Sequence, residues 1–327
     1  MERARAIFFG SGEFAVPVLE ALAAAREVVL VGVVGTPPRP AGRRAVPTAT
    51  PVARAAAALG CPLLVPEGLR DSAVVAEIAA LSPDIGILSD YGKIVPPAIL
   101  DLPAHGILNL HPSLLPRHRG ATPIAAAILA GDAETGVTLF RMDPGMDTGP
   151  VVAAERVMLS GGEDGPGLEA RLAVVAAGLL RRSLGPWLRG ELPAVPQPAA
   201  GATVTQPLRR DDGRLDPRLP AANLERQVRA YRPWPGTWLA TEAGRLAVLR
   251  TAVGEEREAG RSTAGDACRP TAGASPGTVV ADGPGLALVA GDGRLLQLLE
   301  VQPAGGRAMD GAAFRRGRPG VVGTVVG

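Results

Sequence analysis

The chain has 327 residues, 46% of them apolar and 20% charged, with a net charge of +2, so it can form two globular domains with separate cores. This composition excludes a disordered protein, and no apolar run approaches the roughly 18 residues of a membrane span. Cys61 and Cys268 lie far apart with no Cys/His cluster near either, which favours reduced thiols over a metal site. Because the first residues lack the apolar segment of a signal peptide, we expect a cytoplasmic protein.

Strand-like and helix-like patterns alternate through the first 190 residues. The sequence predicts strands at residues 4–9, 26–35, 62–65, 84–89 and 106–110, and helices at 14–25, 50–60, 71–81, 122–131 and 164–184. Two further strands, GVTLFRM and PVVAAERVML, read as a hairpin-like edge. Unbroken apolar strands separated by helices predict a Rossmann-like, doubly wound, mostly parallel sheet over residues 1–190, with ligands bound beyond the carboxyl ends of its strands.

The character of the sequence changes near residue 185. Pro, Gly and Ala are dense and periodicity is lost, so residues 191–207 are expected to be a linker. A helical segment and several short strands follow, which predicts an OB-like β-barrel over residues 208–327, with a polar insertion at 254–276. Residues 204–327 hold 17 arginines against 13 acidic residues, a balance that permits nucleic-acid contact without demonstrating it.

The first predicted strand leads into Gly10, Ser11 and Gly12, with Ala15 at the third position of the dinucleotide-binding pattern. An NAD-dependent oxidoreductase needs an acidic residue about 20 positions further on to hold the ribose. The sequence there, LVGVVGTPPRP, has neither Asp nor Glu. The pattern therefore indicates the fold and a tight turn beside the cleft, and no NAD is expected.

The densest polar cluster is GILNLHPSLLPRHRGATP. Asn109 and His111 are two residues apart at the end of a buried strand, which places both side chains on one face at the edge where ligands bind. A second segment, FRMDPGMDTGPVV, holds Asp143 and Asp147 on a Gly/Pro turn after another strand. Either aspartate, taken alone, could simply cap the turn.

Together these segments resemble the folate-dependent formyltransferases. LNLHPSLLPRHRG and MDPGMDTG carry the resemblance, and FFGSGEFAVPVLEAL, YRPWPGTW and SPGTVV extend it nearly end to end to the branch that formylates methionyl-tRNA. The resemblance implies 10-formyltetrahydrofolate as co-substrate, initiator methionyl-tRNA as partner, and neither a metal nor NAD. We also expect a monomer.

The resemblance also implies roles for individual residues. It assigns catalysis to Asn109, His111 and Asp147; folate binding to Ser113, Leu114, Leu115 and Pro116; the active-site loop to Gly10, Ser11 and Gly12; and tRNA binding to Arg39, Arg43 and Arg44. The sequence departs from the family at Asp90, where a small or apolar residue is expected, and after Arg44, where lysines are missing. His118 stands where an aromatic residue is common, and we assign it no role.

Three alternatives stay open. A related enzyme could formylate another amine, such as an amino-sugar nucleotide or glycinamide ribonucleotide, or could hydrolyse 10-formyltetrahydrofolate. The chain could also be a non-catalytic RNA-binding module, but such a module would have no use for Asn109, His111 and Asp147 in one cleft. The arginine-rich loop and the mildly basic C-terminal part favour tRNA as the substrate.

Overall fold

The computed structural model describes residues 2–41, 46–254 and 274–327, and the chain divides into two compact units. The first unit comprises Met1–Ala127, Asp132–Ser160 and Gly167–Pro207, and the second comprises Ile128–Gly131, Gly161–Pro166 and Leu208–Gly327. In the described part of the chain, none of the helices is both long and apolar enough to cross a membrane.

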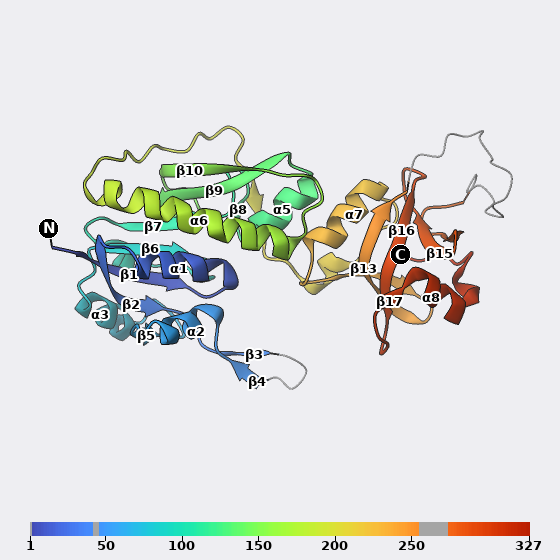
Figure 1. Ribbon diagram of the computed structural model, residues 1–327, viewed down its shortest axis with the longest axis horizontal. Coiled ribbons are helices and arrows are strands. Elements are labelled where there is room, and N and C mark those ends of the chain that lie inside the picture. Colours follow the sequence, from blue (N-terminus) through green and yellow to red (C-terminus); the bar gives the residue numbers. More distant parts are fainter. Residues whose placement is uncertain (1, 42–45, 255–273) are drawn as a thin grey trace. The chain divides into compact units, whose positions relative to one another are not determined.

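A seven-stranded sheet forms the centre of the first unit, in the order β10-β9-β7-β6-β1-β2-β5 (Figure 1). Its strands are β1 (Ala4–Gly10), β2 (Val28–Val34), β5 (Leu63–Leu64), β6 (Ile85–Ser89), β7 (Ile107–His111), β9 (Glu134–Arg141) and β10 (Val151–Met158). Five neighbouring strands run parallel, namely β5, β2, β1, β6 and β7, while β9 is antiparallel to both β7 and β10. The predicted doubly wound sheet with a hairpin-like edge is therefore confirmed.

The chain order reverses between β1 and β6, which are neighbours in the sheet. In doubly wound sheets, ligands bind at this reversal, outside the carboxyl ends of the strands. The end of β1 is Gly10, the end of β6 is Ser89, and β7 ends beside β6 at His111. The topology thus brings the first loop and the polar cluster of the sequence to one edge.

Helices cover both faces of this sheet. They are α1 (Val16–Ala23), α2 (Pro51–Ala58), α3 (Ser72–Ala80), α4 (Pro97–Leu100), α5 (Pro123–Ala130) and α6 (Gly165–Leu188), and a 3₁₀ turn (Glu13–Ala15) precedes α1. Thr50 caps α2 and Asp71 caps α3 through their side-chain oxygens, which explains where these helices begin. Because strand side chains alternate, Ile7 and Phe9 pack in one core with residues of α3 and α4.

Residues 191–207, the predicted linker, belong to the first unit and pair with its strands. Val195 forms an antiparallel bridge with Val151, and β11 (Val204–Thr205) pairs in parallel with β8 (Arg119–Gly120). The preceding helix α6 ends at Leu188, beyond the loss of periodicity at 185. Trp187 holds this last turn, because its indole N–H donates to the carbonyl of His105 at 3.1 Å.

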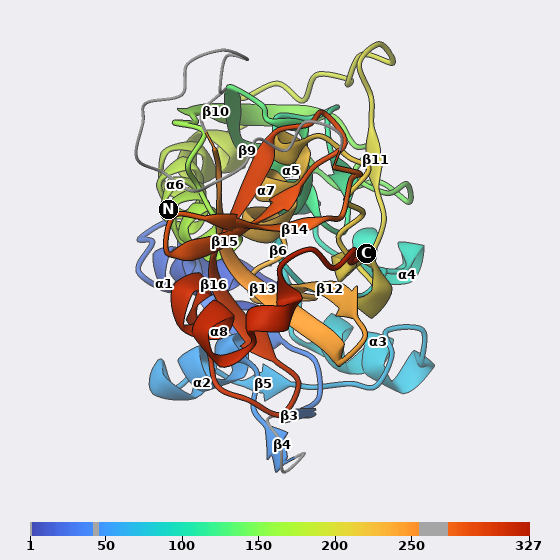
Figure 2. The ribbon, with the colours of Figure 1, turned by 90° about the vertical axis from the view of Figure 1, so that its right-hand side faces the viewer.

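For the C-terminal part, predicted as an OB-like β-barrel, the structure shows an antiparallel sheet in the order β12-β13-β16-β15-β14, with β17 paired to β16. Its elements are β12 (Thr237–Thr241), β13 (Gly244–Val253), β14 (Val279–Asp282), β15 (Gly285–Val289), β16 (Leu295–Pro303), β17 (Met309–Asp310), α7 (Ala221–Ala230), α8 (Gly311–Gly317) and two 3₁₀ turns (Arg210–Gly213 and Pro319–Val321). Leu224 and Val228 of α7 and Phe314 of α8 pack with the strand residues in one core, and Figure 2 shows α8 beside β15 and β16. Most of the predicted insertion, residues 255–273, lies outside the described residues.

Candidate active site

Asn109 and His111 lie on β7 with 7% and 5% of their surfaces exposed. They share one face of the strand, as their spacing predicts. The Asn109 amide makes no hydrogen bond to another described residue. An amide offers two N–H donors and one carbonyl acceptor, so a nearly buried, unpaired amide at a ligand-binding edge is available to a substrate.

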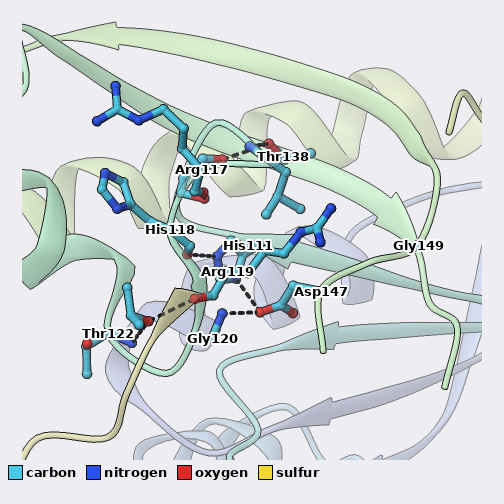
Figure 3. A network of polar contacts seen from close by, with 12 residues as sticks. His111, Arg117, His118, Arg119, Gly120, Thr122, Thr138, Asp147 and Gly149 are labelled. Carbon is cyan, nitrogen blue, oxygen red and sulfur yellow. Dashed lines mark hydrogen bonds and ion pairs between the residues drawn. The ribbon is translucent and has the colours of Figure 1, made fainter. Parts of the chain in front are cut away.

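The two ring nitrogens of His111 have different partners (Figure 3). Nε2 lies 2.8 Å from the backbone carbonyl of His118, and Nδ1 lies 3.6 Å from Oδ2 of Asp147. A carbonyl only accepts, so Nε2 carries a proton and Nδ1 is the nitrogen that gains or loses one. Burial lowers the pKa of His111 below its ordinary value, while the Asp147 carboxylate and the His118 carbonyl act in the opposite direction.

Asp147 is held by its main chain and its side chain. Its φ of +53° is left-handed, which non-glycine residues adopt rarely. The Gly120 N–H donates to its Oδ2 at 2.7 Å, and the Gln197 amide donates to its carbonyl at 2.8 Å. The side chain of Arg119 in turn donates to Gln197 Oε1. Asp147 therefore points at His111 because two distant segments fix it.

Asp143 has the capping role considered for it. Its Oδ1 accepts from the Gly145 N–H at 3.0 Å and from the Thr148 hydroxyl at 2.7 Å. These contacts close the Gly/Pro turn that presents Asp147.

The residues assigned to folate by resemblance divide into two kinds. Leu114, Leu115 and Pro116 line a concavity of about 320 Å³. The rest of its lining comes from Arg117, His118 and Asp132, from β9 and β10, and from the chain near residue 200. Ser113 is fully buried, and its hydroxyl donates to the Arg117 carbonyl at 2.7 Å. Thr138 of β9 fastens this loop, because its hydroxyl donates to the Ser113 carbonyl and accepts from the Leu115 N–H. Asn109, His111 and Asp147 do not line this concavity.

The glycines of the first loop allow another loop to pass close by. A Cβ on Gly12 would lie 1.7 Å from Oδ2 of Asp90, and one on Gly10 would lie 2.9 Å from the Ser89 carbonyl. The Ser11 N–H donates to the Asp90 carbonyl at 2.9 Å, which joins the two loops. Because the Asp90 carboxyl occupies the space beside the Gly10–Gly12 turn, that turn is unsuited to a pyrophosphate.

Asp90 follows the end of β6 and lies against the Gly10–Gly12 turn. Its residue surface is exposed to solvent, yet the surrounding protein desolvates its carboxyl, and Glu169 adds a like charge. These effects raise the pKa of Asp90 to about 7. The folded protein therefore binds a proton here that the unfolded chain, with an Asp pKa of about 3.9, has already lost.

This difference predicts that Asp90→Asn stabilises the protein in alkaline solution. Since the folded pKa is the higher one, the wild type loses stability as pH rises from about 4 to about 7. After allowance for solvent screening, we expect the free energy of unfolding of Asp90→Asn at pH 8 to exceed that of the wild type by about 1 kcal/mol, which raises Tm by about 2–4 °C. At pH 4 we expect the two proteins to be equally stable. Asp101→Asn, at the exposed end of α4, is the control. Equal Tm values for Asp90→Asn and wild type at pH 8 would contradict the prediction.

The structure adds three polar residues that the sequence did not single out: Asp132, Gln197 and Thr203. Gln197 and Thr203 come from the expected linker, and the Thr203 hydroxyl accepts from the His118 N–H at 2.8 Å.

Of the residues assigned to tRNA, Arg39 begins β3 (Arg39–Ala41), which pairs with β4 (Val46–Thr48). Arg43 and Arg44 lie outside the described residues. In the described part of the chain, no group of three or more His, Cys, Asp or Glu side chains is arranged to hold a metal ion.

Comparisons with known proteins match both units. The formyl transferase model matches residues 4–184, and the model of the formyl transferase C-terminal domain matches residues 207–319. Proteins named methionyl-tRNA formyltransferase from Roseiflexus sp. strain RS-1 and Chloroflexus aggregans are 44% and 45% identical, each over 96% of this chain and 92% and 97% of their own lengths. Among solved structures, the fold is similar to that of the N-formyltransferase from Helicobacter canadensis in complex with folinic acid and dTDP-3-aminofucose. The TM-score is 0.63 at 13% identity, over 91% of this chain and 99% of that one. This chain therefore belongs to the formyl transferase family.

Proposed function

We propose that this protein transfers the formyl group of 10-formyltetrahydrofolate to the α-amino group of methionine on initiator methionyl-tRNA. The observation that carries the proposal is the sequence identity of more than 40%, over 96% of the chain, to proteins named methionyl-tRNA formyltransferase. The site supports it, because an unpaired amide and a His–Asp contact meet at the ligand-binding edge of the sheet. We propose that it acts in the cytoplasm, where translation initiation would use these substrates. We propose a monomer, which light scattering of the purified protein tests.

In the proposed reaction, the methionyl amine attacks the formyl carbon and a C–N bond forms. The formyl oxygen then carries negative charge until the bond to N10 of the folate breaks and tetrahydrofolate leaves. Asn109 donates an amide N–H to that oxygen, and His111 adds a charged donor when Nδ1 is protonated. Since the Nε2–H of His111 is held by the His118 carbonyl, Nδ1–H is the ring donor that serves the reaction. Asp147 stabilises the imidazolium and receives the amine proton, directly or through water, and that proton passes on to N10 of the departing tetrahydrofolate.

The remaining residues are proposed to bind the two substrates. Leu114, Leu115 and Pro116 are assigned to the folate side of the site, and the buried Ser113 fixes their loop. The Gly10–Gly12 loop lies beside the entry of the acceptor end. The second unit contacts tRNA phosphates. In the described part of that unit, several exposed arginines make no ion pair and are available for phosphate, namely Arg209, Arg250, Arg307 and Arg316.

The direct test is a transfer assay with purified protein, 10-formyltetrahydrofolate and charged initiator tRNA. We expect formyl-methionyl-tRNA to form at a rate proportional to enzyme. Parallel reactions contain an amino-sugar nucleotide, glycinamide ribonucleotide, or no acceptor. Formylation of one of these small amines without tRNA formylation, or folate hydrolysis alone, would replace the proposal with the corresponding activity.

Arg43→Ala is expected to lower kcat/KM for methionyl-tRNA by about 10-fold, because a tRNA-contacting arginine contributes about 1–3 kcal/mol. The slope of log KM against log salt concentration should also become smaller by nearly one unit, because one contact to a phosphate is lost. Steady-state kinetics at several salt concentrations measure both effects. Arg189→Ala, which removes an exposed arginine paired with Glu191, serves as the matched control. An unchanged salt dependence in Arg43→Ala would remove this residue from the tRNA contact.

A further inference from the structure

We propose that His118 and Asp132 form a positioning pair that holds His111 in the protonation form needed for catalysis. This proposal rests on the proposed function only in taking His111 as catalytic. His118 and Asp132 line the concavity beside Leu114, Leu115 and Pro116, which His111 and Asp147 do not line. His118 acts through its backbone carbonyl, which accepts the Nε2–H of His111 at 2.8 Å (Figure 3).

The main chain of His118 is placed by contacts on both sides. Its φ is +55°, a left-handed conformation that persists in a non-glycine residue only where the surroundings impose it. The His118 N–H donates to the Thr203 hydroxyl at 2.8 Å, and the next residue, Arg119, donates its N–H to the Thr203 carbonyl at 2.9 Å. This conformation turns the carbonyl of residue 118 toward His111.

The side chain of His118 anchors the same conformation. Its Nε2 lies 2.8 Å from Oδ2 of Asp132, and the two side chains are 10% and 12% exposed. Oδ1 of Asp132 accepts from Arg117 at 2.6 Å, so both carboxylate oxygens are used. Asp132 is fixed in turn, because its N–H donates to the carbonyl of Ala127, which lies in the last turn of α5. The pair thus ties the loop after β7 to the start of β9.

Packing alone does not explain this pair. Two nearly buried polar side chains lose much of their hydration, and an apolar ring could fill the same space without that loss. The pair instead fixes the orientation of the His118 carbonyl. This acceptor keeps one proton on Nε2 of His111. Nδ1 then faces Asp147 and the reaction. Without the anchor, His111 could shift its neutral proton to Nδ1 or turn its ring, and both changes would misalign the donor.

The test uses the full-length protein labelled with ¹⁵N-histidine. The chain has three histidines, so the imidazole spectrum is simple, and His105→Asn assigns one of them. In the wild type we expect neutral His111 to be protonated on Nε2, with a hydrogen-bonded Nε2–H signal. His118→Phe keeps an aromatic ring but cannot bond Asp132, whereas the Nε2 of His118→Gln can replace the lost donor. Glu155→Gln, which removes an exposed ion pair with Arg182, is the control.

For His118→Phe we expect a mixture of His111 tautomers, loss of the hydrogen-bonded signal, and a fall in kcat of about 10-fold or more with little change in KM for methionyl-tRNA. Asp132→Asn should shift the spectrum in the same direction, and His118→Gln should restore both the tautomer and most of kcat. If His118→Phe fails to fold, the Asp132→Asn and His118→Gln spectra decide. An unchanged His111 tautomer in the variants overturns the proposal. Absence of tRNA formylation in the wild type would defeat the proposed function instead, and the spectra would still test the pair.

Discussion

Asn109→Ala is expected to lower kcat for formyl transfer by about 10²–10³-fold, because it removes one donor to the oxyanion of the transition state. KM for methionyl-tRNA and for the folate should change little, since the lost interaction forms mainly as the formyl oxygen becomes charged. The variant should fold normally. The Asn109 amide has no partner among the described residues, so its removal leaves no buried group unpaired.

Single-turnover measurements with saturating substrates give this rate directly. Ser89→Ala is the matched control, because Ser89 is a buried polar residue at the end of the neighbouring strand whose hydroxyl also has no partner. We expect Ser89→Ala to retain nearly full activity. A rate for Asn109→Ala within about three-fold of that control would exclude an oxyanion role for Asn109.

The sequence predicted the parts of the site that depend on local pattern. Period two placed Asn109 and His111 on one face of β7, and unbroken apolar strands predicted the sheet at whose edge they lie. The same pattern predicted the long helix α6 but ended it at 184, because Gly185 and Pro186 read as a break. The helix continues to Leu188, where a bond from Trp187 to His105, 82 positions away, supports the last turn.

The contacts that orient the site were not predictable in this way. Gln197 reaches the Asp147 carbonyl from 50 positions away, and Thr203 reaches His118 from 85 positions away. Both residues belong to a Pro- and Ala-rich stretch without periodicity, so no local signal distinguishes them from a solvated linker. Asp132 follows the end of α5 and reads as an ordinary turn residue. Only the tertiary fold shows that it meets His118.

The first loop shows how one local pattern can serve two different sites. Gly10 and Gly12 satisfy the spacing of a dinucleotide-binding turn because both kinds of site need a main chain without side chains at these positions. Here the close neighbours are the main chain of Ser89 and the carboxyl of Asp90, which fills the space beside Gly12 that a phosphate would need. Asp90 was visible in the sequence as a departure from the family, but its position against Gly12 depends on the pairing of β1 with β6.

His111→Ala and Asp147→Asn are each expected to reduce kcat by about 10²–10³-fold, and the double variant should be little worse than the more damaged single variant. The reason is that Asp147 acts largely through His111, with its Oδ2 3.6 Å from Nδ1. An asparagine at 147 can still accept from the Gly120 N–H, so the loop should keep its shape. What it loses is the negative charge that raises the pKa of His111 against the lowering effect of burial.

The sign of the pH effect follows from that charge. In Asp147→Asn the pKa of His111 should fall further below its ordinary value, so the imidazolium fraction at pH 7 decreases and the charged donor is lost. An NMR titration of His111 in wild type and Asp147→Asn measures this shift in pKa. Single-turnover rates of the wild type, the two single variants and the double variant form a double-mutant cycle that measures the coupling between His111 and Asp147. Coupling should also be absent between Asp147 and a distant exposed residue such as Arg189. Losses that add fully in the double variant, or a higher pKa of His111 in Asp147→Asn, would show that the two residues act independently.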